Sequence, residues 1–273
     1  MQLTDNLTLK ADRQLLMAGN CVLEDRDTAM RTAEFLVGFS EKLGVDYIFK
    51  ASYKKDNRSS EAYFSGLPID EALQIFQDVK TEFGVPVISD VHYPSDLDAG
   101  IADVIDIFQI PAYLVMQTEL LLAVANTGKP VNIKKAQFLH PEDMGKVVKK
   151  AKSTGNDKIM LTERGTCFGY RDLVVDPRSF HLMKQTGCPV IFDAGHSIRK
   201  YGVPSSDPKG GAKEYLPTLM AAAAATDLSG LFIEVHPEPS RALCDAASQL
   251  SFAEAEERIT QYMQIAQFVS NLT

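Results

Sequence analysis

A run of basic residues stands out in a chain whose formal net charge is −8. Lys50, Lys54, Lys55 and Arg58 lie within nine residues of one another, directly after the apolar run 47–49. Clustered cations repel one another and do not help a fold to close. They can hold phosphate or carboxylate, because lysine offers a point charge and arginine a bidentate fork. A solvated basic loop is the alternative. Polar or charged residues also follow the other short apolar runs of the chain, and this recurrence favours an anion site.

Two sets of residues along the chain could bind a ligand or a metal, and most of them come just after short apolar runs. The cationic set, suited to a small ligand with several negative charges, consists of Lys50, Lys55, Lys134 and Arg164, with Gln109 also at the end of a run. The second set could ligate a divalent metal and consists of Cys21, His196, Glu234 and Asp245. The spacing of the second set is not diagnostic, since no CxxC or HExxH motif occurs. A buried structural cysteine and a capping aspartate are the alternative reading.

Eight short apolar runs must position these side chains. We predict strands at 15–18, 47–51, 86–89, 104–109, 131–134, 158–161, 189–192 and 231–234, and helices at 28–43, 69–83, 118–126, 141–153, 177–185, 215–226 and 252–269. The gap 91–103 leaves room for about two helical turns. Strands and helices that alternate with a period near 30 residues indicate a parallel sheet with right-handed crossovers.

Eight such units favour closure into one (β/α)8 barrel, a TIM barrel, that spans residues 1–273 as a single domain. A doubly wound open sheet is the competitor, but it usually has a glycine-rich phosphate turn after its first strand, and AGNC is not that turn. Residues 1–13 are expected to form an N-terminal hairpin plug. The stretch 199–212, rich in Gly, Pro and Ser, is longer than a simple connection needs and is expected to be a lid or a disordered loop.

Composition excludes several classes of function. The acidic balance argues against nucleic acid as the main partner. No apolar run approaches the length of a membrane span, and the first residues lack the apolar core of a signal peptide. Four cysteines are scattered without a pairing pattern. The cytoplasm is therefore the expected location.

Seven segments together resemble the 3-deoxy-D-manno-octulosonate 8-phosphate synthase family: FKASYKKDNRSS, SDVHYPSD, FQIPAYL, NIKKAQF, ERGTCFGY, IFDAGHS and FIEVHPEPSRALCDAASQL. The similarity covers nearly the whole chain. The NRSS segment is its most specific element and separates this family from the related 3-deoxy-D-arabino-heptulosonate 7-phosphate synthases. The resemblance implies a (β/α)8 barrel, usually a homotetramer. It also implies condensation of phosphoenolpyruvate with arabinose 5-phosphate and water, a step toward bacterial lipopolysaccharide that releases phosphate.

The resemblance also implies roles for individual positions. Phosphoenolpyruvate would be bound by Lys50, Lys55, Gln109, Lys134 and Arg164, and the acceptor sugar by Asn57, Arg58 and Ser59. The metal ligands would be Cys21, His196, Glu234 and Asp245, and the catalytic residues Lys55, His196 and Asp245. Members of the family with Cys at the position of Cys21 need a divalent ion, whereas members with Asn there work without one. The ion could be Zn, Fe, Mn or Co.

Three positions near the expected sugar site depart from the family's pattern. Asp56 stands where Ala is usual, Met116 where an Arg commonly reaches a neighbouring subunit's sugar phosphate, and Arg199 where Gln is usual. A lost arginine removes a charge-assisted hydrogen bond to phosphate, and an added carboxylate opposes an anion. A different aldose acceptor for the same chemistry is therefore a second hypothesis. A third is a non-catalytic barrel that binds anions or metal.

Overall fold

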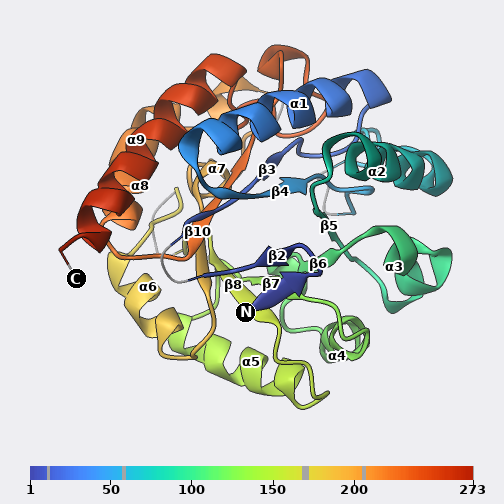
Figure 1. The fold of residues 1–273 in the computed structure, drawn as a ribbon, viewed down its shortest axis with the longest axis horizontal. Helices are drawn as coiled ribbons and strands as arrows, with labels where there is room; N and C mark the ends of the chain where they lie inside the picture. Colours follow the sequence, from blue (N-terminus) through green and yellow to red (C-terminus); the bar gives the residue numbers. More distant parts are fainter. Residues whose placement is uncertain (11–12, 57–59, 168–171, 205–206, 273) are drawn as a thin grey trace.

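The protein folds as a closed barrel of eight parallel strands surrounded by helices (Figure 1). The computed structural model describes residues 1–10, 13–56, 60–167, 172–204 and 207–272. Neighbouring strands follow chain order, and β10 closes the ring against β3. The expected (β/α)8 barrel is confirmed.

The barrel strands are short and buried along almost their whole length, as strands covered on both faces should be. They are β3 (Leu15–Gly19), β4 (Asp46–Lys50), β5 (Val87–Asp90), β6 (Ile107–Ile110), β7 (Val131–Lys134), β8 (Ile159–Glu163), β9 (Val190–Asp193) and β10 (Gly230–Glu234). Each predicted run overlaps one of these strands. Six of the eight strands end on a charged residue, and these side chains lie toward the same rim.

Helices cover the outside of the barrel and present an apolar face to it. They are α1 (Arg26–Leu43), α2 (Ile69–Phe83), α3 (Ile101–Val104), α4 (Thr118–Asn126), α5 (Met144–Lys152), α6 (Pro177–Lys184), α7 (Ala194–Ser197), α8 (Leu216–Ala224) and α9 (Phe252–Ser270). Local signals set their ends. Asp25 caps α1 by accepting a hydrogen bond from the Thr28 backbone, and Gly44 ends that helix in the left-handed conformation.

Three predicted elements begin with a different kind of structure, and most of the remaining boundaries shift by one or two residues. The predicted strand 104–109 starts too early, because Val104 belongs to α3 and the strand begins at Ile107. The predicted helices at 141 and 215 instead begin as 3-10 turns, η3 (Pro141–Asp143) and η5 (Lys213–Tyr215). Apolar content alone does not distinguish a buried helical turn from a strand. The gap 91–103 does hold two short turns, η1 (Pro94–Ala99) and α3.

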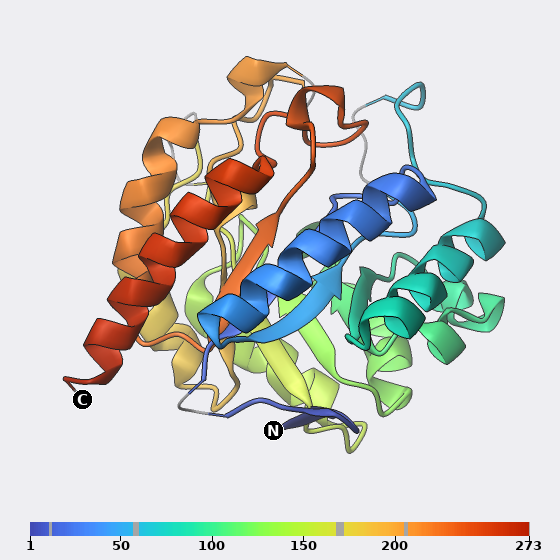
Figure 2. The ribbon, with the colours of Figure 1, turned by 45° about the horizontal axis from the view of Figure 1, so that its top comes forward.

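The predicted N-terminal hairpin is present as β1 (Gln2–Thr4) and β2 (Leu7–Thr8), which pair antiparallel. It lies across the end of the barrel opposite the carboxyl-terminal loops (Figure 2). Leu3, Leu7 and Leu9 join a core cluster with side chains from inside the barrel, which continues up to Phe232 of β10. The hairpin therefore seals the amino-terminal end of the barrel with apolar side chains.

No helix in the described part of the chain combines the length and the apolar character needed to cross a membrane.

Candidate active site

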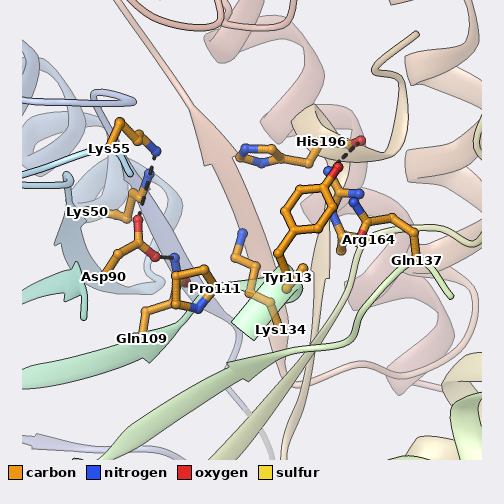
Figure 3. Close-up of a pocket in the computed structure, with 11 residues that line it drawn as sticks. Lys50, Lys55, Asp90, Gln109, Pro111, Tyr113, Lys134, Gln137, Arg164 and His196 are labelled. Atoms are coloured by element: carbon orange, nitrogen blue, oxygen red, sulfur yellow. Dashed lines mark hydrogen bonds and ion pairs between the residues drawn. The ribbon is translucent and has the colours of Figure 1, made fainter. Parts of the chain in front are cut away.

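A pocket opens at the carboxyl-terminal rim of the barrel, where a (β/α)8 barrel carries its functional residues. Its lining comes from strands β4 to β7 and from the segments that follow β4, β6, β7, β8 and β9, and it consists of Lys50, Lys55, Asp90, Gln109, Pro111, Ala112, Tyr113, Lys134, Gln137, Arg164 and His196. Figure 3 shows Lys50 and Lys55 on one side, Arg164 and Gln137 on the other, and Lys134 between them. All five predicted phosphoenolpyruvate residues line this one pocket.

Two of the pocket's cations lie beside the same carboxylate. Lys50 is 1% exposed, and its Nζ lies 2.6 Å from Glu234 Oε1. Lys55 Nζ lies 4.0 Å from that oxygen and 3.8 Å from Asp90 Oδ2. Burial opposes the charge of Lys55, but the Glu234 and Asp90 carboxylates beside it favour the ammonium, and the pKa of Lys55 is raised well above its usual value. Lys55 therefore stays an ammonium and supplies a fixed positive charge.

Lys134 is held between a carboxylate and a ring. Its Nζ pairs with Asp193 and lies 3.3 Å from the centroid of the Phe232 ring. Burial, helped by the positive charge of Lys50, lowers the pKa of Lys134 to about 8 even though Asp193 favours the charged form. Asp193 remains ionised because the nearby His196, Lys134 and Arg164 lower its pKa against the effect of burial. Lys134 thus loses its proton at a lower pH than a free lysine does.

Arg164 completes the cationic set from the far side of the pocket. Among the described residues no carboxylate lies within ion-pair distance of its guanidinium. Its Nη1 instead donates to the Tyr201 hydroxyl at 2.9 Å, and its Nη2 donates to the His196 carbonyl at 3.4 Å. Gln137 also donates to the Tyr201 hydroxyl. A phenol oxygen therefore accepts hydrogen bonds from two groups that could bind an anion.

A chain of hydrogen bonds joins neighbouring strands from β8 to β5. Thr162 donates to Asn132 Oδ1 at 2.7 Å, and Asn132 Nδ2 donates to Gln109 Oε1 at 2.9 Å. Gln109 Nε2 in turn donates to Asp90, which also accepts from the Ser52 hydroxyl. The order of donors and acceptors fixes which end of the Gln109 amide carries the nitrogen. One amide hydrogen of Gln109 is left for a ligand in the pocket.

The four predicted metal ligands meet beside the pocket, although Cys21 follows β3, His196 lies in α7, Glu234 ends β10 and Asp245 lies in the segment after β10. Cys21 Sγ lies 3.4 Å from Asp245 Oδ2, and His196 Nε2 lies 3.7 Å from that same oxygen. Glu234 Oε2 is 4.0 Å from His196 Nε2. Ligand atoms of one tetrahedral ion stand roughly 3.3–3.8 Å apart, given bonds of about 2.0–2.3 Å. The donor set therefore has the chemistry and nearly the spacing that a divalent ion needs.

Neighbouring groups orient two of these donors. Asp193 contacts His196 Nδ1 at 2.9 Å, which leaves Nε2 facing Glu234 and Asp245, as in carboxylate–histidine–metal arrangements. Arg199 Nη1 lies 3.1 Å from Asp245 Oδ1, so the other oxygen of Asp245 is the one that faces Cys21 and His196. Arg199, with His196 and Lys55, holds the pKa of Asp245 below its usual range although burial alone would raise it. Burial raises the pKa of the Cys21 thiol.

The predicted acceptor residues Asn57, Arg58 and Ser59 lie outside the described residues. Their neighbour Asp56 accepts a hydrogen bond from the Tyr93 hydroxyl, and its Oδ1 lies 4.0 Å from Lys54 Nζ. A second pocket adjoins the first and is lined by Asp56, His92, Tyr93, Pro111, Tyr113, Leu114 and Gln117. Met116 is 52% exposed. Of the three unusual positions, Asp56 lines this second pocket and Arg199 contacts a predicted metal ligand.

Sequence reasoning missed several residues of the site. Gln137 and Tyr113 line the pocket, Tyr201 bonds Arg164, and Cys244 Sγ lies 3.0 Å from Cys21 Sγ. Gln137 and Tyr113 stand inside segments that carried the family resemblance, NIKKAQF and FQIPAYL, so their place in those motifs was an available signal. Tyr201 lies in an irregular loop, where no periodic pattern predicts the direction of a side chain.

A parallel barrel whose carboxyl rim gathers buried cations beside a sulfur, nitrogen and oxygen donor group is the architecture of an enzyme for small, multiply charged substrates. The model of the DAHP synthetase I family matches residues 4–270, and the chain belongs to this family.

The curated relatives are similar over nearly their whole length. A 2-dehydro-3-deoxyphosphooctonate aldolase from Acidithiobacillus ferrooxidans is 48% identical over 256 residues, which cover 94% of this chain and 90% of the relative. Proteins of the same name from Syntrophobacter fumaroxidans (44% identical, 96% and 90% covered) and Francisella philomiragia (45% identical, 94% and 92% covered) also match. The predicted resemblance is confirmed.

Proposed function

We propose that this chain is a 2-dehydro-3-deoxyphosphooctonate aldolase, which condenses phosphoenolpyruvate with arabinose 5-phosphate and water to give 3-deoxy-D-manno-octulosonate 8-phosphate and phosphate. In bacteria this is a step toward lipopolysaccharide. The similarity to relatives of that name supports the assignment. The observation that carries it is the convergence of Lys50, Lys55, Lys134 and Arg164, all nearly buried, on one pocket.

Phosphoenolpyruvate would be bound by this cationic set. Its carboxylate and phosphate need fixed positive charge in a place where water does not screen it. Arg164 and Lys55 are the least neutralised of the cations, since Arg164 has no carboxylate at ion-pair distance among the described residues and Lys55 has only contacts of 3.8 and 4.0 Å. The free amide hydrogen of Gln109 adds a neutral donor. These contacts would hold the donor so that its C3 faces the aldehyde carbon of the sugar.

The residues that flank the pocket would serve the condensation itself. Because Lys55 keeps its proton, we assign it to donate a hydrogen bond to the oxygen on which negative charge develops, not to act as a base. His196 and the ionised Asp245 lie beside the place where the aldehyde and the attacking water would bind. After water adds at C2 of the donor, cleavage of the C–O bond would release phosphate.

We further propose that Cys21, His196, Glu234 and Asp245 hold a divalent metal, Zn, Fe, Mn or Co. Bound there, the ion would supply Lewis-acid polarisation of an oxygen near the aldehyde. Treatment with a chelator, followed by elemental analysis and readdition of each ion, tests this proposal. Activity should be lost and then restored by at least one ion. Full activity in a metal-free sample would exclude the assignment.

A panel of acceptors is the experiment for the overall reaction. Phosphate release from phosphoenolpyruvate should be fastest with arabinose 5-phosphate among aldoses that differ in length and phosphorylation. The second candidate, another aldose, is favoured by the Asp56 carboxylate in the adjoining pocket, because it repels a sugar phosphate. Asp56→Ala separates the two readings: it should lower the KM for arabinose 5-phosphate if that sugar's phosphate binds near position 56. Release with another sugar and none with arabinose 5-phosphate would replace the first reading by the second.

A homotetramer and a cytoplasmic location complete the proposal. Both rest on the resemblance to the family, and the cytoplasm also on the scattered cysteines. Light scattering coupled to size exclusion measures the oligomer, and cell fractionation the location.

A further inference from the structure

Lys135 and Glu163 form a buried ion pair that the proposed reaction does not use. Lys135 is fully buried and Glu163 is 1% exposed, and Lys135 Nζ lies 3.4 Å from Glu163 Oε1. Each stands beside a cation of the pocket in the chain: Lys135 follows Lys134, the last residue of β7, and Glu163, the last residue of β8, precedes Arg164. On both strands the pair is therefore one residue away from a group proposed to bind phosphoenolpyruvate.

Glu163 holds the backbone of the segment that carries Arg164. Its Oε1 accepts hydrogen bonds from the backbone nitrogen of Arg164 at 3.0 Å and from that of Gly165 at 2.6 Å. Its other oxygen, Oε2, is buried and has no hydrogen-bond partner in the described part of the chain. Because one charged oxygen accepts from two consecutive N–H groups, it fixes the direction in which the chain leaves β8. That direction sets the point from which the Arg164 side chain starts.

Lys135 joins this segment to the loop after β7. Its ammonium also contacts four oxygens of the two segments, namely the carbonyls of Ala136, Gly165 and Leu139, at 3.2, 3.4 and 3.5 Å, and the hydroxyl of Thr166, at 3.0 Å. The loop after β7 carries Gln137, which lines the pocket and whose carbonyl accepts a hydrogen bond from the backbone of Cys167 at 2.9 Å. One buried ammonium therefore links two walls of the pocket through their backbones.

The side chain of Arg164 has few contacts of its own to hold it. Among the described residues its guanidinium bonds the Tyr201 hydroxyl at 2.9 Å and the His196 carbonyl at 3.4 Å, with no carboxylate at ion-pair distance. Its placement therefore depends on its backbone. Stability alone is a weak reason for the buried pair behind it, because burying two charges is costly and apolar replacements of such pairs are often as stable.

We propose that Lys135 and Glu163 are positioning residues for Arg164, which fix the segment after β8 so that the guanidinium meets phosphoenolpyruvate. The pair acts through the backbone and does not touch the substrate. A bidentate contact between a guanidinium and an anion depends closely on geometry, so a small displacement of Arg164 weakens it. The inference rests on the proposed function, which supplies the ligand.

Calorimetric titration of phosphoenolpyruvate in a double-mutant cycle tests the inference. Lys135→Met should raise the Kd at least about tenfold when Arg164 is present. In the Arg164→Met background the same substitution should change the Kd less than about twofold, because the residue through which it acts is gone. The KM for the sugar at saturating phosphoenolpyruvate should change less than about twofold in Lys135→Met. A general loss of structure would raise both constants.

A second variant guards against simple failure to fold. Lys135→Met alone leaves the Glu163 carboxylate buried without its partner, which destabilises the protein. Lys135→Met combined with Glu163→Gln removes both charges, and the glutamine keeps an oxygen for the two backbone N–H groups. This double variant should fold and should still bind phosphoenolpyruvate about tenfold more weakly, because methionine donates no hydrogen bond to the loop carbonyls.

Lys80→Met is the matched control. Lys80 Nζ lies 2.7 Å from Asp106 Oδ1 and donates to the Val104 carbonyl at 2.8 Å, so this partly buried pair also holds a loop. That loop precedes β6 and lies at the other end of the strands from the pocket. Lys80→Met should lower the free energy of unfolding and leave the Kd for phosphoenolpyruvate unchanged.

Equal effects of Lys135→Met with and without Arg164 would overturn the inference, as would wild-type affinity in Lys135→Met or in the double variant. Phosphate release with arabinose 5-phosphate, measured on the same samples, separates this failure from failure of the proposed function. A wild type that binds and condenses phosphoenolpyruvate, with a Lys135→Met variant of equal affinity, would remove only the positioning role. A wild type that does not bind phosphoenolpyruvate would overturn the proposed function and the inference together.

Discussion

Raising the pH from 7 to 9 should weaken phosphoenolpyruvate binding about tenfold, because Lys134 loses its proton in that range. Burial lowers the pKa of this lysine to about 8 in the unliganded pocket. Binding requires the ammonium, so the apparent Kd is the intrinsic Kd divided by the protonated fraction. That fraction is roughly 0.9 at pH 7 and 0.09 at pH 9 for a pKa of about 8. The tenfold loss corresponds to about 1.4 kcal/mol.

Deprotonation of Lys134 should have the opposite effect on the free energy of unfolding: raising the pH weakens binding but stabilises the fold at this group. The unfolded chain keeps the ordinary lysine pKa of 10.5, so between pH 8 and 10.5 it binds more protons at this site than the folded protein does. The contribution of Lys134 to the free energy of unfolding therefore rises with pH across that window. Weaker binding at high pH would not reflect unfolding caused by this group.

Calorimetric titration of phosphoenolpyruvate in the absence of sugar, at constant ionic strength and in buffers of different ionisation heat, measures both the affinity and the proton uptake. Lys134→Met should bind more weakly at pH 7 and lose the slope between pH 7 and 9. Lys129→Met is the matched control: Lys129 precedes the other end of β7, and burial lowers its pKa too, but its Nζ bonds the Ile105 carbonyl far from the pocket. A flat wild-type profile, or a slope that survives in Lys134→Met, would refute the reasoning.

Three further predictions concern single substitutions. Gly19→Ala should destabilise the fold by about 1–3 kcal/mol or more, because a Cβ there would lie 2.2 Å from the Lys50 carbonyl oxygen. Gly38→Ala, in the open middle of α1, should instead stabilise it by about 0.5–1 kcal/mol in the same denaturant titration. Tyr201→Phe should tighten phosphoenolpyruvate binding about 2–10-fold, since the Tyr201 hydroxyl no longer competes for Arg164. Weaker binding in that variant would mean that the hydroxyl contacts the donor directly.

The strands were predictable because their apolar runs are short, β-branched and separated by helical spacing. The start of β6 was not, since Val104 and Ile105 look like strand residues but lie at the end of a short helix. Asp106, between them and β6, accepts a hydrogen bond from the backbone of Val87 and pairs with Lys80. Such contacts depend on residues distant in the chain, and no local pattern contains them.

The residues of the candidate site were predictable from their positions after the strands, because the carboxyl ends of barrel strands meet at one rim. The residues at those ends do meet, but the sequence suggested two separate sets, one cationic and one metal-binding. The structure joins them through Glu234, which pairs with Lys50 while it faces His196. Which carboxylate pairs with which cation depends on side-chain directions inside the barrel. Cys244 was overlooked for the same reason, because only the fold brings it to Cys21.

The N-terminal hairpin has a consequence at the opposite end of the molecule. Leu3, Leu7 and Leu9 are the lowest layer of an apolar column whose top is the ring of Phe232, and that ring underlies the ammonium of Lys134. These apolar side chains exclude water from the side of Lys134 that faces the barrel interior. The burial that lowers the pKa of Lys134 is therefore provided by the packed interior beneath the site as well as by the residues of the rim.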